Sequence, residues 1–286
     1  MRKLPLRALL VALVILVAGG AVLAQRSFRQ RNTADPRGEQ EGPATPRWEY
    51  PLGFKKDVFT FVRLIYNTGG RRGRGWGGAG NWRTDWPDAD LNFAWRLQQM
   101  TSMKVDPDGK CLEITDPELL RHPFCYIAEP GDIHFSDEEA AILRRYLLNG
   151  GFLMFDDFWG EEQWEIMAEA MARVFPDRQW VDLPRTHPIF HCVFDIPNDL
   201  NLQCPNVGLG TSSQYHGRTW ETADSQDVHI RGLFDDKGRL CVIATHNTDN
   251  GDGWEREGEN EYYFREFSEK KAYPLGINII FYAMTH

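Results

Sequence analysis

The stretch PFCYIAEPGDIHFSDEEAAILRRYLLNGGFLMFDDF, residues 123–158, decides the fold class. Its two apolar runs, residues 123–128 and 151–157, have the length and composition of buried strands. Between them, Ser136 and Glu139 form a capping box, which predicts a helix over residues 136–149 that ends at the following glycines. A strand, a helix and a second strand in this order predict a parallel β-α-β unit.

The same alternation continues on both sides of this unit. The elements predicted before it are a strand at 58–66, a helix at 88–103, a short strand at 112–114 and a helix starting at Asp116-Pro117. Those predicted after it are a helix at 161–175, a hairpin at 228–245 and a buried helix at 274–285. We therefore expect an α/β fold of three layers, in which helices cover both faces of a mostly parallel sheet. The second half, residues 180–272, is expected to add an antiparallel extension to that sheet.

The composition is that of a globular protein and excludes several classes. The 286 residues are 42% hydrophobic and 26% charged, which rules out wholesale disorder. The formal net charge is -9, from 32 Lys and Arg against 41 Asp and Glu. There is no cationic excess of the kind that nucleic-acid binders carry, so we expect no nucleic acid as a partner.

The first 24 residues differ from the rest of the chain. Three cations in residues 1–7 precede an apolar stretch at residues 8–24, and small residues precede Gln25, a pattern typical of a secretory signal peptide. An uncleaved signal anchor stays open, because the apolar stretch reaches the lower limit for spanning a bilayer. We expect an exported protein, periplasmic or extracellular, that contacts the inner membrane only if residues 8–24 remain as an uncleaved anchor.

The chain after this segment divides into two parts. Residues 25–50 are polar and contain prolines, which predicts a flexible tether, and residues 51–286 are expected to form a single α/β domain. Removal of residues 1–24 leaves 29 cations against 41 acids, a charge of -12. This acidity favours a cation or a neutral ligand, such as a glycan, over an anionic surface. An envelope protein is the other expected class of partner.

Five cysteines are present, so they cannot all pair within one chain. We expect Cys125 and Cys241, which lie in apolar runs, to be buried free thiols. A disulfide between Cys192 and Cys204 stays open, because export permits it.

In parallel sheets, ligands bind beyond the carboxyl ends of the strands, which directs attention to residues 67–87, 129–135 and 156–160. The first of these loops carries Arg71, Arg72 and Arg74. It is interpreted either as a loop that closes over an anionic or carbonyl-bearing ligand or as a surface loop.

Acidic residues follow the predicted strand at 151–157. The side chains of Asp156 and Asp157 are expected to point to opposite faces, so that one caps the next helix and the other enters the crevice as a general base or metal ligand. Asp85, Asp88 and Asp90 lie near the same edge. Carboxylates from these loops suit a divalent cation, which stays open as a cofactor; no resident metal is assigned.

Two further segments attract attention. His187 and His191 are four apart, but Pro188 disfavours the helix that a zinc site would need, so we interpret His187 as a hydrogen-bonded structural or crevice residue. Residues 246–255 are expected to form a tight turn that presents Asp249, Asp252 and Trp254.

A series of landmarks in a fixed order gives the chain a family resemblance. The landmarks are Arg63-x-x-Tyr66, Trp82-x-x-Asp85-x-Pro87-x-x-Asp90-x-Asn92, Pro123-Phe124-x-Tyr126, Gly150-Gly151-Phe152-Leu153, Asp156-Asp157-Phe158, His187-Pro188-Ile189-Phe190, Asn247-x-Asp249, Asp252-x-Trp254-Glu255 and Leu275-Gly276-x-Asn278 with Tyr282. Over residues 58–286 the chain resembles the bacterial family called domain of unknown function 4159. The resemblance implies a flavodoxin-like sheet of the class I glutamine-amidotransferase type and no established activity, in relatives that are often exported or membrane-anchored.

The amidotransferase-like fold normally carries a cysteine nucleophile on the turn after a strand. Here Cys125 lies inside a predicted strand, and the position after that strand holds Glu129 or Asp132. The catalytic triad therefore does not carry over. Glu129 joins the candidate ligand-binding residues, as do landmark residues at this edge, namely Trp82, Asn92, Asp249 and Trp254.

Two functional hypotheses follow. In the first, the protein is a non-catalytic ligand- or partner-binding domain of the cell envelope on an amidotransferase-like scaffold. In the second, it is a hydrolase of envelope glycans or amides that uses Asp85, Asp90, Asp156 or Asp157, and His187. Trp82, Trp86 and Trp159 would then stack on sugars, although core packing explains such aromatic residues equally well. The second hypothesis predicts a pair of carboxylates about 5–10 Å apart.

Overall fold

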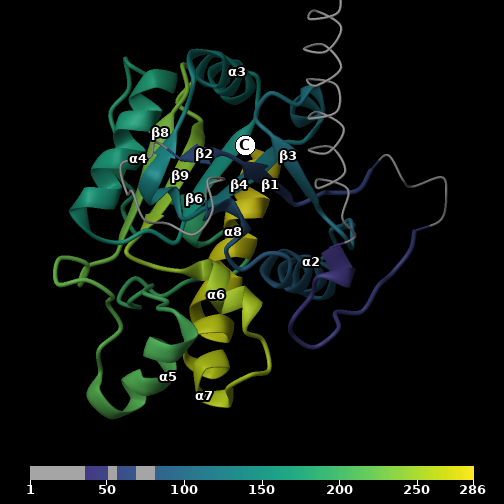
Figure 1. Ribbon diagram of the computed structural model, residues 1–286, viewed down its shortest axis with the longest axis vertical. Coiled ribbons are helices and arrows are strands. Elements are labelled where there is room, and N and C mark those ends of the chain that lie inside the picture. The colour runs from purple at the N-terminus through teal and green to yellow at the C-terminus, as the bar shows by residue number, and fades with distance from the viewer. Residues whose placement is uncertain (1–35, 51–56, 69–80) are drawn as a thin grey trace, which may run out of the picture. The chain divides into compact units, whose positions relative to one another are not determined.

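The computed structural model describes residues 36–50, 57–68 and 81–286 (Figure 1). The predicted signal segment at residues 1–24 and the loop arginines Arg71, Arg72 and Arg74 lie outside these residues. Within the described part, no helix has both the length and the apolar character needed to cross a membrane. Glu39–His286 forms one compact unit.

A seven-stranded sheet forms the centre of this unit and confirms the predicted fold class. Its strand order is β3-β1-β4-β6-β9-β8-β7. The strands are β1 (Val62–Ile65), β3 (Lys110–Glu113), β4 (Phe124–Ala128), β6 (Phe152–Asp156), β7 (Val181–Asp182), β8 (His229–Phe234) and β9 (Leu240–His246). The first four strands of the order pair in parallel, and β9 also pairs with β6 in parallel, with Met154 opposite Ile243. The predicted hairpin suggested that both of its strands would belong to the antiparallel extension. In the sheet, β9 runs parallel to β6, so the antiparallel extension begins with β8.

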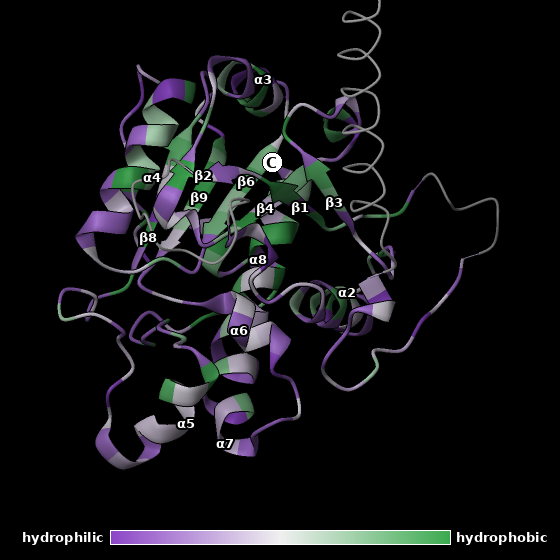
Figure 2. Cartoon of the chain, in the orientation of Figure 1, coloured by the Kyte–Doolittle hydropathy of each residue, from purple (hydrophilic) through white to green (hydrophobic). Residues whose placement is uncertain are grey.

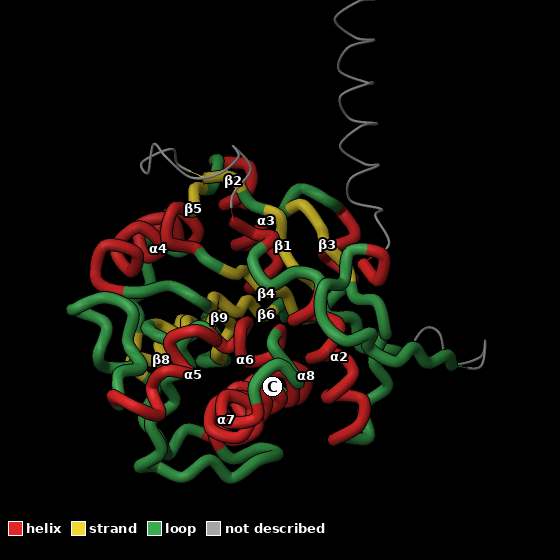
Figure 3. The backbone as a smooth tube through the Cα atoms, turned by 60° about the horizontal axis from the view of Figure 1, so that its bottom comes forward, coloured by secondary structure: helices red, strands yellow, loops and turns green. Residues whose placement is uncertain are grey.

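Helices cover both faces of the sheet and give the three predicted layers. The α-helices are α2 (Asp88–Met100), α3 (Asp137–Leu148), α4 (Gly160–Val174), α5 (Val207–His216), α6 (Asn250–Glu255), α7 (Glu261–Tyr263) and α8 (Tyr273–Thr285). Figure 3 shows the strands between α3 and α4 on one side and α2, α6 and α8 on the other. A π-helix, Phe264–Ala272, joins α7 to α8, and a small ribbon of β2 (Asn67–Thr68) and β5 (Ile133–His134) lies apart from the main sheet. The short 3-10 helices are Pro36–Gly38, Asn81–Arg83, Pro117–Arg121, Pro130–Asp132 and Pro188–Phe190.

Alternation along the buried strands divides the core into two clusters. In β4, Tyr126 faces the cluster that contains Phe93 of α2 and Trp254 of α6, whereas Ile127 faces the cluster that contains Leu143 of α3. This arrangement follows from the two-residue period of a strand. The apolar residues of the strands and of α8 accordingly concentrate in the interior (Figure 2).

Residues 39–50, which lie within the predicted tether, belong to the compact unit Glu39–His286. The indole of Trp48 donates a hydrogen bond to the carbonyl of Val105, and its ring lies 5.4 Å from that of Trp95. The backbone amides of Glu41 and Gly42 donate to the carboxylate of Asp88 at 2.8 Å. Trp48 therefore attaches this segment to the rest of the compact unit.

The structure also tests the local predictions of helices and thiols. Ser136 caps α3 through both halves of the predicted capping box, because its side chain accepts from the Glu139 amide and Glu139 accepts from Ser136. The five cysteines are free, so the Cys192–Cys204 disulfide is not formed. The Cys204 thiol lies buried 3.5 Å from the Tyr263 hydroxyl, whereas the Cys192 thiol contacts the carbonyl of Asn278 at 3.1 Å.

Candidate functional site

Five carboxylates meet beyond the carboxyl ends of β1, β6 and β9. We call them the acidic cluster; its members are Asp85, Asp157, Asp249, Asp252 and Glu255. One oxygen from each of Asp85, Asp157 and Asp249 lies within 4.8 Å of the other two, and the same is true of Asp85, Asp252 and Glu255. Asp85 thus belongs to two groups of three, in accordance with the rule that ligand sites form at this edge of a parallel sheet.

Arg63 of β1 fixes the loop that leads to Asp85. Its buried guanidinium donates to both oxygens of Asp90, at 2.6–3.1 Å, and to the backbone carbonyls of Trp82 and Thr84, at 3.0 and 2.9 Å. A buried, forked ion pair of this kind orients both partners. Asp90, one of the predicted catalytic candidates, is therefore the structural partner of Arg63 and lies outside the acidic cluster.

Asp156 and Asp157 have different roles. Asp156, fully buried at the end of β6, accepts hydrogen bonds from Tyr126, Thr245, Asn250 and the Gly251 amide. It thereby holds the start of α6 against the sheet. Asp157 has a left-handed backbone, with a φ of 57°, and its carboxylate enters the acidic cluster while accepting from the Trp159 indole at 3.0 Å.

The prediction that one of these two aspartates caps the next helix is wrong. Helix α4 begins at Gly160, and Trp159 in the N-cap position provides no side-chain hydrogen bond. Instead, the Asn247 side chain accepts from the Gly160 amide, and Asp224 accepts from the Glu161 amide. Both acceptors come from segments far along the chain, which a local pattern does not reveal.

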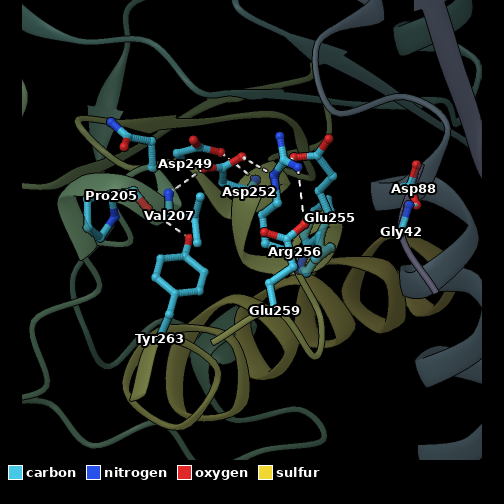
Figure 4. A network of polar contacts seen from close by, with 12 residues as sticks. Gly42, Asp88, Pro205, Val207, Asp249, Asp252, Glu255, Arg256, Glu259 and Tyr263 are labelled. Atoms are coloured by element: carbon cyan, nitrogen blue, oxygen red, sulfur yellow. Dashed lines mark hydrogen bonds and ion pairs between the residues drawn. The ribbon is translucent and has the colours of Figure 1, made fainter. Parts of the chain in front are cut away.

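Helix α6 supplies the other three carboxylates (Figure 4). Asp249 caps the helix by accepting from the Asp252 amide at 2.7 Å, so residues 250–255 are helical and not the predicted tight turn. Asp249, Asp252 and Glu255 are spaced by three residues, which places them on one side of the helix. Asp252 accepts from the Val207 amide at 2.6 Å, and Glu255 lies 2.5 Å from the Arg256 guanidinium.

The acidic cluster is buried and carries more negative charge than its neighbours balance. Asp85 is 8% exposed and Asp249 is 4% exposed. Burial raises the pKa of Asp85, Asp157 and Asp249 well above the usual range, and the neighbouring carboxylates raise it further. Burial also raises the pKa of Glu255 to about 8, against the opposing effect of Arg256. Protons or a bound cation must therefore compensate these carboxylates.

One oxygen of Asp85 shows this need most directly. Its Oδ2 is buried and accepts no hydrogen bond from any residue that the structure describes. It lies directly over Gly251, where a Cβ atom would come within 2.2 Å of it. An unpaired buried carboxylate oxygen is costly, so a ligand that neutralises it would stabilise the fold.

The remaining sequence candidates divide between the edge of the site and the core. Glu129 follows β4 with a φ of 46°, and its side chain accepts from Asn81. Its charge contributes to the raised pKa of Asp157. Trp82 is buried, with its ring 6.1 Å from that of Trp86.

Asn92 and Trp254 hold α6 from the core side. The Asn92 amide donates to the carbonyls of Trp254 and Glu255, at 2.9 and 3.1 Å. The Trp254 ring is fully buried, 4.4 Å from that of Phe93. Both residues therefore position the acidic cluster and do not line it.

His187 lies near the start of β9, at the opposite end of this strand from the acidic cluster. Its ring packs 5.3 Å from that of Tyr282 and 6.4 Å from that of Phe234, which pairs with Leu240 at the start of β9. Its Nδ1 accepts from the Ile189 amide, in agreement with a structural role. The structure does not bring His187 to the carboxylates with which the hydrolase hypothesis grouped it.

A comparison of the chain with models of protein families gives one match. A family model described as Domain of unknown function (DUF4159) matches residues 60–284. The chain belongs to this family. No curated protein matches the chain. The DUF4159 region runs from β1 into α8 and includes all five members of the acidic cluster.

Patterns in the sequence predicted part of this DUF4159 site. The rule for strand ends pointed to Asp85 and Asp157, and the composition of residues 246–255 pointed to Asp249 and Asp252. Glu255 was missed as a site residue, as was Arg63 as the residue that orients the Asp85 loop. The three-residue spacing of Asp249, Asp252 and Glu255 was the signal in the sequence that could have identified Glu255.

Proposed function

We propose that this DUF4159 domain binds a divalent cation through Asp85, Asp157 and Asp249 and, with it, holds a ligand or partner in the cell envelope. The observation that carries the proposal is the buried Oδ2 of Asp85, which has no donor among the described residues, in a residue whose carboxylate lies within 4.8 Å of two others. Carboxylate oxygens are the ligands that Ca²⁺ and Mg²⁺ prefer. Oxygens on opposite sides of a Ca²⁺ ion lie about 4.6–5.2 Å apart, so the observed spacing suits one ion.

Binding is favoured over amidotransferase-type catalysis by the residues around β4. Cys125 is fully buried within the strand, and burial raises the pKa of its thiol, which disfavours the reactive thiolate. Glu129 occupies the turn directly after the strand, where this type of fold would carry its nucleophile. The envelope location rests on the cationic start and apolar stretch of residues 1–24.

A carboxylate-dependent hydrolase is the second candidate. It is supported by the close approach of Asp252 and Glu255 and by the pKa of Glu255, about 8, which keeps a proton available at neutral pH for a general acid. Hydrolysis of a peptidoglycan fragment in the presence of EDTA, lost in Glu255→Gln, would favour this candidate. Absence of any turnover under both cation-loaded and cation-free conditions would favour binding.

Calorimetric titration of the full chain with CaCl₂ or MgCl₂, after treatment with EDTA, tests the proposal. We expect saturable binding, and at a hundredfold excess over Kd a stabilisation of about 2.7 kcal/mol. Asp157→Asn and Asp249→Asn should each weaken binding at least tenfold. Asp236→Asn is the matched control, because Asp236 forms a surface ion pair with Arg178 in the turn between β8 and β9. A chain that neither binds nor is stabilised by either cation would refute the proposal.

A further inference from the structure

The acidic cluster contains two groups of three carboxylates that share one residue. Asp85 lies within 4.8 Å of Asp157 and Asp249 in one group, and of Asp252 and Glu255 in the other. We infer that the site binds two divalent cations, with Asp85 between them as a shared ligand. This inference rests on the proposed function, because it adds a second ion to the same site.

The arrangement of the chain separates the two groups around Asp85. Asp157 directly follows β6 and Asp249 is the N-cap residue of α6, whereas Asp252 and Glu255 lie within that helix. The Asp85 carboxylate lies over Gly251, between these parts of α6, in the space that a side chain at Gly251 would fill. A carboxylate has two oxygens and about four lone-pair directions, so one aspartate can serve two ions.

Hydrogen bonds leave ligand positions available in both groups. Asp252 accepts from the Val207 amide through Oδ2, and Asp249 accepts from the Asp252 amide through Oδ1. The independent observation is again Asp85, the residue that the two groups share, whose Oδ2 is buried and unpartnered within the described residues. Backbone amides thus hold Asp249 and Asp252 in place, while Oδ2 of the shared Asp85 has no donor among the described residues.

The charge balance also favours two ions over one. Five carboxylates contribute five negative charges, and Arg256, beside Glu255 and 4.0 Å from Asp252, contributes one positive charge. The buried Arg63 is already paired with Asp90. One divalent cation would therefore leave more than one carboxylate of the cluster uncompensated in a buried site, whereas a second cation would offset this charge.

Stoichiometry measured on the full chain tests this inference. Titration of the EDTA-treated protein with Ca²⁺, monitored by calorimetry and by native mass spectrometry, should give two ions per chain. Glu255→Gln and Asp249→Asn, which remove a ligand from one group each, should reduce the number to one. Asp85→Asn should weaken both sites at least tenfold, and Asp236→Asn should still bind two ions.

Mn²⁺ provides a second readout that does not depend on enthalpy. Two Mn²⁺ ions that share a carboxylate should give an exchange-coupled electron paramagnetic resonance signal, and Glu255→Gln should convert it to the signal of an isolated ion. These neutral variants remove repulsion between carboxylates, so they are expected to fold, as circular dichroism would verify.

The outcomes distinguish the two proposals. Two ions in the wild-type chain, with one in Glu255→Gln, support the inference. One ion in the wild-type chain, unaffected by Glu255→Gln, overturns the two-ion site and leaves the proposed function standing. No bound ion overturns both.

Discussion

Arg63→Lys tests whether a buried cation orients the Asp85 loop. In the native protein, Arg63 donates to both oxygens of Asp90 and to the carbonyls of Trp82 and Thr84. Lysine keeps the charge, but its single ammonium does not reproduce the planar fork that reaches all of these acceptors. Each lost hydrogen bond from a charged donor costs about 1.5–3 kcal/mol, so loss of both carbonyl contacts should lower the free energy of unfolding by about 3 kcal/mol or more.

The loop displacement should also reduce cation affinity, because Asp85 directly follows Thr84. We expect at least a tenfold increase in the Kd for Ca²⁺. Urea unfolding in EDTA measures the stability, and calorimetric titration measures the affinity on the same preparation. The matched control is Arg47→Lys, which alters an exposed ion pair with Asp108 and should change the stability by less than about 1 kcal/mol.

Two results would refute this reasoning. An Arg63→Lys variant as stable as the wild-type chain would show that the buried fork does not hold the loop. A variant that loses stability but binds Ca²⁺ with unchanged affinity would show that the position of Asp85 does not depend on Arg63.

Three other predictions concern stability, the cation site and the thiols. Burial lowers the pKa of His246 to about 4 from its ordinary value of 6.5, so the folded state favours the neutral ring: stability is full above pH 6.5 and should fall by about 3 kcal/mol towards pH 4. His246→Gln should flatten the corresponding part of a pH series of urea unfolding curves; an unchanged slope would contradict the assignment. Gly251→Ala should displace the Asp85 carboxylate and lower Ca²⁺ affinity more than tenfold, whereas Gly238→Ala, in the turn between β8 and β9, should leave affinity unchanged, as titration would show. Under native conditions a thiol reagent should rapidly modify Cys192 alone, because it is the exposed cysteine, and should modify all five after unfolding without reductant; a count of three would indicate a disulfide.

Local signals predicted the fold well where a pattern has its cause in neighbouring residues. The capping box at Ser136 and Glu139 fixed the start of α3, because both hydrogen bonds are made within four residues. The direction of β9 was harder to predict, since a hairpin with β8 is compatible with parallel pairing of β9 with β6 on its other side. The sequence contains no local signal that β6 is the second neighbour of β9.

The candidate site was predictable only in part, for a similar reason. Asp157 entered it because the end of a parallel strand is a general location for ligands. Glu255 was not predicted as a site residue, because its position depends on α6, which the sequence did not predict. This helix is short, contains two glycines and depends on distant contacts, including those of Asp156 with Asn250 and Gly251. The hydrolase hypothesis grouped His187 with Asp85 and Asp157, but its ring packs against Tyr282 and Phe234, because the sequence does not specify which end of the sheet a loop faces.

The contacts of Glu41, Gly42 and Trp48 make part of the polar stretch before β1 an integral part of the domain. A chain shortened to begin at residue 51 would leave the Asp88 carboxylate without the amides of Glu41 and Gly42 and would remove the aromatic partner of Trp95. Any shortened version of the protein used to measure cation binding should therefore begin no later than Glu39.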